Sequence, residues 1–179
     1  GTKGKTTCAN LLEHIFRWNG TPVAVLSSVG NRINGTWLTT GLTTPQPDYI
    51  HAFLHTCKLH GVRVVVMEVA AQAISLHRID GIVFDSLIIT NISKEHGEFY
   101  PEYTTYRAEK ARLLEFSHAN TSIYVNADDT EVASMAPKRA SVQYYGFTDN
   151  AVWKGEYSTT LHHESCVYMP AWDTHIRST

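Results

Sequence analysis

The first seven residues, of sequence GTKGKTT, constrain the fold of this chain more than any other stretch. They place two glycines before a Lys-Thr-Thr run, and helical apolar spacing follows directly. A glycine-rich turn at a helix start lets backbone N–H groups close around an anion, and the helix dipole favours negative charge there. In such a turn the lysine neutralises phosphate oxygens and the next hydroxyl can bind Mg²⁺. The sequence therefore predicts a phosphate-binding loop, made of Gly1, Thr2, Lys3, Gly4, Lys5, Thr6 and Thr7.

Composition limits the chain to one good-sized domain and indicates no polyanionic partner. With 179 residues, 43% of them hydrophobic, the chain can bury a real core. The 15 basic and 17 acidic residues give a formal charge of -2, so we expect neither nucleic acid nor a membrane as partner. No apolar run approaches the roughly 20 residues of a membrane helix. Three scattered cysteines without CxxC spacing favour free thiols and a cytoplasmic location.

Helix and strand signals alternate along the first third of the chain. Apolar spacing predicts a helix over residues 6–19 and a short strand over residues 23–26. Residues 29–38 contain an Asn-Gly pair, which is a hairpin signal. A Thr-Pro pair predicts a second helix that starts at residues 44–45 and ends before Gly61.

Three later apolar runs predict buried parallel strands, over residues 62–69, 82–89 and 122–125. Each run ends in polar residues, and a helix is predicted between the last two, over residues 101–116. This pattern is typical of an α/β fold with an open, mostly parallel sheet flanked by helices, where ligands bind at the carboxyl ends of the strands. We expect the polar strand ends to lie together, and short strands to follow near the C-terminus.

Three side chains are candidates for binding a nucleotide-bound Mg²⁺. Glu68 ends one predicted strand, and His96 follows the next strand in a polar segment. Each has an ordinary alternative, a solvated strand-end carboxylate or a structural histidine. Together with Thr6, they would surround the ion while phosphate oxygens complete its coordination, an arrangement suited to phosphoryl transfer.

Lys110 occupies an unusual position in the predicted helix 101–116. It falls on the apolar stripe that contains Tyr103, Tyr106 and Leu113. The ordinary explanation is that its methylenes cover the core while its ammonium reaches water. The functional explanation is that partial burial favours the neutral amine, which pairs with an acid or forms a metal-binding carbamate.

A further loop and a threonine pair offer candidate substrate contacts. Arg78 follows the strand 62–69 and could hold a phosphate or carboxylate, although an ordinary surface arginine is an equal alternative. Thr43 and Thr44 are candidates too, or no more than a helix cap.

Six motifs occur in an order and spacing that resemble the central ATP-binding domain of the Mur ligase family, most closely its UDP-N-acetylmuramoyl-tripeptide synthetase type. The resemblance covers about residues 1 to 150. The motifs are GTKGKTT from Gly1, TTP from Thr43, MEVAAQ from Met67, TNISKEH from Thr90, YRAEKARL from Tyr106 and NADD from Asn126.

The resemblance implies an ATP- and Mg²⁺-dependent ligase of peptidoglycan precursor synthesis. In such enzymes ATP phosphorylates the terminal carboxylate of a UDP-N-acetylmuramoyl peptide, and the amine of an amino acid attacks the acyl phosphate. It implies residue roles as well. Lys5, His96 and Lys110 are catalytic, and Lys110 is carbamylated; the metal ligands are Thr6, Glu68, His96 and Lys110, and the muramoyl peptide contacts are Thr43, Thr44 and Arg78.

The resemblance also implies what the chain lacks. Family members have an N-terminal domain that grips the uridine nucleotide and a C-terminal domain that selects the amino acid. We therefore expect residues 1–179 to be a single central domain without its first strand, with little or no ligase activity when isolated.

Departures from the family pattern keep other functions open. Ala70 and Ala71 replace serines, Leu76 replaces a substrate-binding glutamine of some members, and Glu95 replaces an aspartate. The alternatives are a folylpolyglutamate or cyanophycin-type ligase, and a nucleotide-binding module without catalysis.

Overall fold

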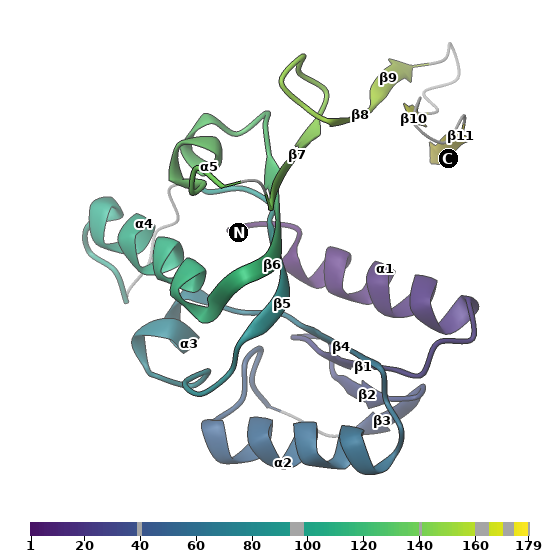
Figure 1. The fold of residues 1–179 in the computed structure, drawn as a ribbon, viewed down its shortest axis with the longest axis vertical. Coiled ribbons are helices and arrows are strands. Elements are labelled where there is room, and N and C mark those ends of the chain that lie inside the picture. The colour runs from purple at the N-terminus through teal and green to yellow at the C-terminus, as the bar shows by residue number, and fades with distance from the viewer. Residues whose placement is uncertain (39–40, 94–98, 140, 160–164, 170–173, 179) are drawn as a thin grey trace. The chain divides into compact units, whose positions relative to one another are not determined.

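The computed structural model describes residues 1–38, 41–93, 99–139, 141–159, 165–169 and 174–178 (Figure 1). The chain forms two compact units. The first contains Gly1–Ile82 and Lys94–Glu115, and the second contains Val83–Ser93 and Phe116–Thr179. None of the helices in the described parts is long and apolar enough to cross a membrane.

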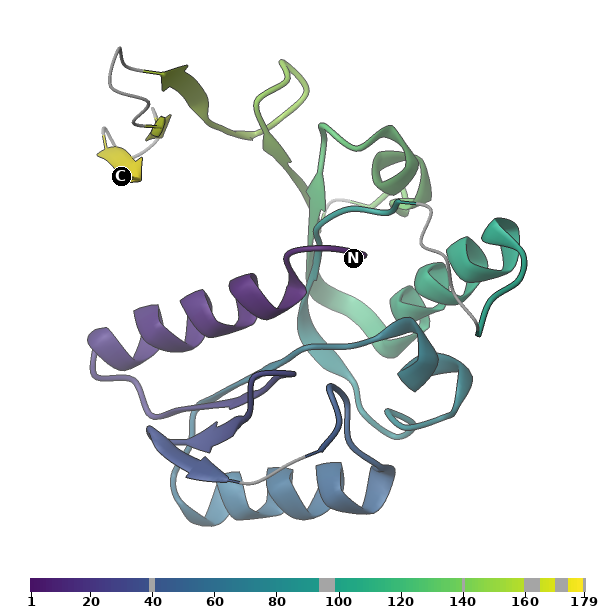
Figure 2. The ribbon, with the colours of Figure 1, turned by 180° about the vertical axis from the view of Figure 1, so that it is seen from behind.

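The first unit is built on a four-stranded sheet of order β3-β2-β1-β4. Strand β1 pairs parallel to β4 and antiparallel to β2, and β2 and β3 form a hairpin. Helices α1 and α2 lie on opposite sides of this sheet, as Figures 1 and 2 both show. The bounds are α1 Lys5–Trp18, β1 Val23–Leu26, β2 Asn31–Ile33, β3 Thr36–Leu38, α2 Pro47–Leu59, β4 Val64–Met67, α3 Ala71–Ser75 and α4 Tyr103–Ala111.

Strand β1 is the centre of the first unit's core. Its sequence VAVL is apolar throughout, and all four residues are at most 1% exposed, as expected for a central strand covered on both faces. Its pairing with β4 runs from Val23 opposite Val64 to Leu26 opposite Met67. Because the two strands are parallel and in register, their carboxyl ends lie side by side.

The second unit contains an all-parallel sheet of order β5-β6-β7-β8 and an antiparallel sheet of order β11-β10-β9. Helix α5 packs against β6. The bounds are β5 Phe84–Ile89, β6 Ser117–Asn126, α5 Thr130–Met135, β7 Val142–Gly146, β8 Trp153–Lys154, β9 Glu156–Thr159, β10 Ser165–Met169 and β11 Thr174–Ser178.

The α/β class and the short C-terminal strands are confirmed, with the described strands divided among three sheets. The predicted start of α2 at residues 44–45 is wrong, because the helix begins at Pro47. A residue before proline avoids the helical region, and Gln46 accordingly has φ -70° and ψ 158°. The predicted helix 101–116 is also shorter, since α4 passes into a 3-10 helix at Arg112–Phe116.

A buried glutamate fastens α1 to the sheet. Glu13 is 2% exposed, and its carboxylate lies 3.3 Å from the guanidinium groups of both Arg17 and Arg32. Arg32 also lies over the Trp37 ring, 4.4 Å from its centroid. The charge of Glu13 is therefore balanced inside the protein, which makes it a structural carboxylate.

Candidate functional site

The predicted phosphate loop turns into α1 at Gly4. This glycine has φ 78°, a left-handed conformation, and its carbonyl accepts the first helical hydrogen bond from the Cys8 N–H at 2.9 Å. Lys5, the first helical residue, donates from Nζ to the Thr2 carbonyl at 2.9 Å. The N–H groups of the first helical turn have no carbonyl partner within the helix, so the turn can receive an anion.

We expect Gly4→Ala to weaken nucleotide binding out of proportion to its effect on stability. A Cβ at Gly4 meets no atom within 4 Å, so its cost is the left-handed backbone, about 1–2 kcal/mol. Gly20, after the other end of α1, is a matched control with φ 71° and the same open surroundings. Thermal unfolding and MgATP titration of both variants check this. Equal nucleotide affinity in the two variants would contradict a role for the loop.

Glu68 lies directly beside this loop. The Thr6 hydroxyl lies 2.9 Å and 3.0 Å from the two carboxylate oxygens. Ser28, which follows β1 closely, donates to one of them from its backbone N–H at 3.0 Å and from its hydroxyl at 3.1 Å. The parallel pairing of β1 and β4 explains this meeting, since the Glu68 N–H donates to the Leu26 carbonyl at 2.8 Å.

The environment of Glu68 differs from that of Glu13. Glu68 is 5% exposed, yet no lysine or arginine of the described parts of the chain makes an ion pair with it. A buried carboxylate held only by hydroxyl and N–H donors leaves a net negative charge that a cation can balance. Its oxygen-rich surroundings, with the hydroxyls of Thr6 and Ser28, are of the hard type that Mg²⁺ prefers.

The described residues contain no cluster of three or more histidine, cysteine or acidic side chains that could hold a metal by themselves. Mg²⁺ usually needs no such cluster, because it binds through one or two carboxylates together with phosphate oxygens and water. The residues present therefore fit a magnesium ion that arrives with a nucleotide.

Thr44 and Arg78 are engaged within the protein. The Thr44 hydroxyl donates to the Glu68 carbonyl at 3.0 Å and accepts from the Ala70 N–H at 3.1 Å. Arg78 donates to the Thr44 carbonyl at 3.0 Å. Thr44 is 1% exposed, whereas Thr43 is half-buried. These contacts fix the backbone on both sides of Glu68, and a contact with substrate stays a prediction for Thr43, Thr44 and Arg78.

Lys110 lies near the phosphate loop. Its Nζ lies 4.5 Å from the centroid of the Tyr106 ring, and the Tyr106 hydroxyl is 3.1 Å from the Thr2 hydroxyl. Lys110 and Lys5 both lie close enough to Gly1, the first residue of the loop, for their charges to act on it. Two cationic side chains are thus close to the loop, as binding of a polyphosphate requires.

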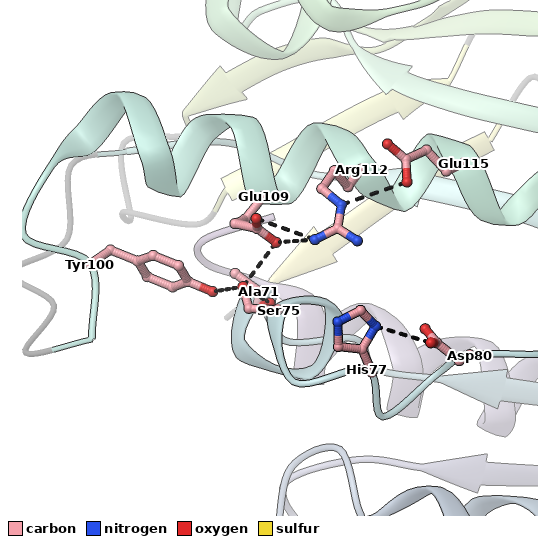
Figure 3. A network of polar contacts seen from close by, with 8 residues as sticks. All are labelled: Ala71, Ser75, His77, Asp80, Tyr100, Glu109, Arg112 and Glu115. Atoms are coloured by element: carbon pink, nitrogen blue, oxygen red, sulfur yellow. Dashed lines mark hydrogen bonds and ion pairs between the residues drawn. The ribbon is translucent and has the colours of Figure 1, made fainter.

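Sequence reasoning missed a polar network that joins α3 to α4 (Figure 3). Ser75 contacts the Tyr100 hydroxyl at 2.6 Å and donates to Glu109 at 2.9 Å. Glu109 in turn accepts from Arg112 at 2.9 Å. The Glu–Arg spacing of three residues was a visible signal for this pair. Because Glu109 precedes Lys110, the network fixes the helix that carries the lysine.

His96 lies outside the described residues, so its role stays a prediction. In the second unit, the polar residues at and after the carboxyl ends of β5 and β6 make hydrogen bonds to the backbone of neighbouring loops. Asn126 donates to the Thr90 carbonyl at 2.8 Å, and Asp129 accepts from the N–H groups of Ile92 and Val132 at 2.7 Å and 3.1 Å. Asp128 accepts from the N–H of Phe147 at 2.9 Å. The expected proximity of these residues to Glu68 also stays a prediction.

Comparison with known proteins identifies the family of the chain. The family model described as the Mur ligase middle domain matches residues 1–178. A UDP-N-acetylmuramoyl-L-alanyl-D-glutamate–2,6-diaminopimelate ligase of Parabacteroides distasonis is 33% identical over 157 residues, which are 87% of this chain and 32% of that protein. The ligase of the same name from Corynebacterium glutamicum is 36% identical over 148 residues, 80% of this chain and 28% of that protein.

Two further comparisons agree. A UDP-N-acetylmuramyl-tripeptide synthetase of Leifsonia xyli is 37% identical over 123 residues, 69% of this chain and 24% of that protein. A solved structure of a UDP-N-acetylmuramoyl-L-alanyl-D-glutamate–2,6-diaminopimelate ligase has the same fold, with a TM-score of 0.80 at 20% identity over 100% of this chain and 37% of that one. The chain spans about a third or less of the length of these curated relatives.

Proposed function

Because this chain belongs to the Mur ligase family and spans its middle domain, we propose that it binds MgATP for an amide-forming ligase. The observation that carries the proposal is the buried Glu68 carboxylate. It has no lysine or arginine partner among the described residues, and the hydroxyls of Thr6 and Ser28 surround it. It adjoins a glycine-led helix start with Lys5 in its first turn. A phosphate loop, a cationic side chain and an oxygen-rich metal site together are the parts that phosphoryl transfer needs.

The proposed reaction joins an amino acid to a UDP-N-acetylmuramoyl peptide. The peptide carboxylate attacks the γ-phosphorus of ATP and ADP leaves, which produces an acyl phosphate. The amine then attacks the acyl carbon, loses a proton and expels inorganic phosphate, so that one amide is formed for each ATP consumed. The relatives named above support this substrate class, and we place the reaction in the cytoplasm with the muramoyl precursor.

The residues of this chain have distinct roles in that reaction. The amides from Gly1 to Gly4 and the ammonium of Lys5 hold the phosphates. Thr6 and Glu68, with His96 and a carbamate on Lys110, would hold Mg²⁺, which would neutralise developing charge on the phosphate oxygens. Thr43, Thr44 and Arg78 are proposed to orient the muramoyl peptide. The flanking domains of the longer relatives would hold the uridine nucleotide and choose the amino acid.

The first test is equilibrium binding of MgATP to this chain by calorimetry, with EDTA as the control for the metal. We expect saturable binding that EDTA weakens strongly, and the absence of any ATP binding would overturn the proposal. The second test measures ADP release with a UDP-muramoyl dipeptide and a panel of amino acids. Residues 1–179 alone should give little or no turnover. Release with folate or cyanophycin substrates instead would assign the chain to another ligase of the family.

A further inference from the structure

Tyr106 contacts both Thr2, at the start of the phosphate loop, and Lys110. It lies in the first turn of α4, four residues before Lys110, so the two side chains share a helix face. Its side chain is 8% exposed although its hydroxyl is polar. A buried tyrosine hydroxyl needs a partner, and Thr2, itself 5% exposed, supplies one at 3.1 Å.

The ring of Tyr106 makes the second connection. The Lys110 Nζ lies 4.5 Å from the ring centroid, within the distance at which a cation is attracted to an aromatic face. The rings of Tyr100 and Tyr103 lie 5.4 Å and 6.5 Å away between centroids, so aromatic neighbours restrict the Tyr106 ring on other sides. The ring thus gives the flexible lysine side chain a neighbour whose own position is restricted.

We propose that Tyr106 is a positioning residue that couples nucleotide binding to Lys110. Its hydroxyl holds Thr2, and its ring holds the lysine. Thr2 is tied in turn to the helix start, because its carbonyl accepts from Lys5 Nζ at 2.9 Å. Tyr106 therefore links the residue that holds Lys5 to the side chain of Lys110. The inference rests on the proposed MgATP site and adds a residue to it.

Two substitutions separate the two contacts. Tyr106→Phe removes the hydroxyl and keeps the ring, whereas Tyr106→Leu removes both. Calorimetry with MgATP should show a Kd roughly three- to tenfold higher for Tyr106→Phe, the effect of one lost buried hydrogen bond. Thr2→Val removes the same hydrogen bond from its other side and should give a similar loss. The double variant should bind no more weakly than either single variant, since both act through one bond.

A spectroscopic measurement reports on the lysine directly. In chain labelled with ¹³C-lysine, the ε-methylene proton signal of Lys110 should be shifted upfield by the Tyr106 ring, with Lys110→Arg used to assign it. The shift should persist in Tyr106→Phe and disappear in Tyr106→Leu. A general loss of stability would not change the Lys110 chemical shift in Tyr106→Leu while leaving it unchanged in Tyr106→Phe.

Tyr49→Phe is the matched control. It also removes a tyrosine hydroxyl from the first unit, but that hydroxyl accepts from the Asn31 side chain and does not contact Thr2. Its MgATP affinity should stay within about twofold of wild type. The proposal would be overturned if Tyr106→Phe bound MgATP as tightly as wild type, or if the losses in the double variant were additive. It would also be overturned if the chemical shift of Lys110 were the same in Tyr106→Leu as in wild type. If wild type binds no MgATP, the proposed function fails, while the Lys110 signal still decides whether Tyr106 holds the lysine.

Discussion

We expect Glu68→Gln to weaken binding of MgATP by roughly 100-fold, because an amide oxygen is a poor substitute for a carboxylate in a metal site. The fold should tolerate this change. A glutamine oxygen can still accept from the Ser28 N–H, and the hydroxyls of Thr6 and Ser28 can rotate to suit the amide. The free energy of unfolding without nucleotide should therefore change by less than about 1.5 kcal/mol. Calorimetry and urea unfolding measure the two quantities on the same samples.

Glu13→Gln is the matched control, since both glutamates are buried carboxylates of the first unit. We expect this variant to lose stability and to keep its affinity for MgATP. The substitution removes the carboxylate charge that pairs with the Arg32 guanidinium. Because an unpaired buried charge is costly, the free energy of unfolding should fall by about 3 kcal/mol. The affinity of the folded protein for MgATP should stay near that of wild type. If Glu68→Gln destabilised the fold as much and bound MgATP normally, Glu68 would be a structural residue.

Lys110→Ala should lower ligase turnover roughly 100- to 1,000-fold, the loss typical of removing one group that stabilises transition-state charge. The variant is made in a form of the protein that carries the flanking regions of its relatives, and ADP release with a UDP-muramoyl dipeptide is measured. Lys110→Arg keeps a cation but cannot form a carbamate. We expect it to be as inactive as Lys110→Ala, with added bicarbonate rescuing neither.

The control for Lys110 is Lys58→Ala, which removes an exposed lysine from the last turn of α2. Its turnover should be within about twofold of wild type. Near-normal turnover of Lys110→Ala would contradict a catalytic role, and activity in Lys110→Arg alone would show that the lysine acts as a cation and not as a carbamate.

Local chemistry made part of the fold predictable. The helix of α1 follows from apolar spacing and a glycine at each end, and β1 follows from four consecutive apolar residues. The start of α2 was predicted wrongly because two signals competed. A Thr-Pro pair suggested a cap at Thr44, but Pro47 forced Gln46 into an extended conformation. The hydroxyl of Thr44 was then free to hold the backbone around Glu68.

Other contacts were beyond the reach of sequence reasoning because they join distant segments. Nothing in the local pattern around Ser28 indicates that its N–H meets Glu68, which lies 40 residues later. The same holds for Tyr106 and Thr2, which are 104 residues apart. Helix spacing placed Lys110 on the apolar side of its helix, but only packing could show the Tyr106 ring beneath its ammonium.

The sequence by itself determined the α/β class, the glycine-led start of α1 and the family, because these depend on short-range spacing and on motifs in a fixed order. Only the tertiary structure showed which buried carboxylate is paired with arginines and which, among the described residues, has only hydroxyl and N–H donors. As side chains, Glu13 and Glu68 carry the same carboxylate, so residue type alone does not distinguish them. The parallel register of β1 and β4 brings hydroxyls to Glu68, whereas a residue of β2, Arg32, brings a positive charge to Glu13.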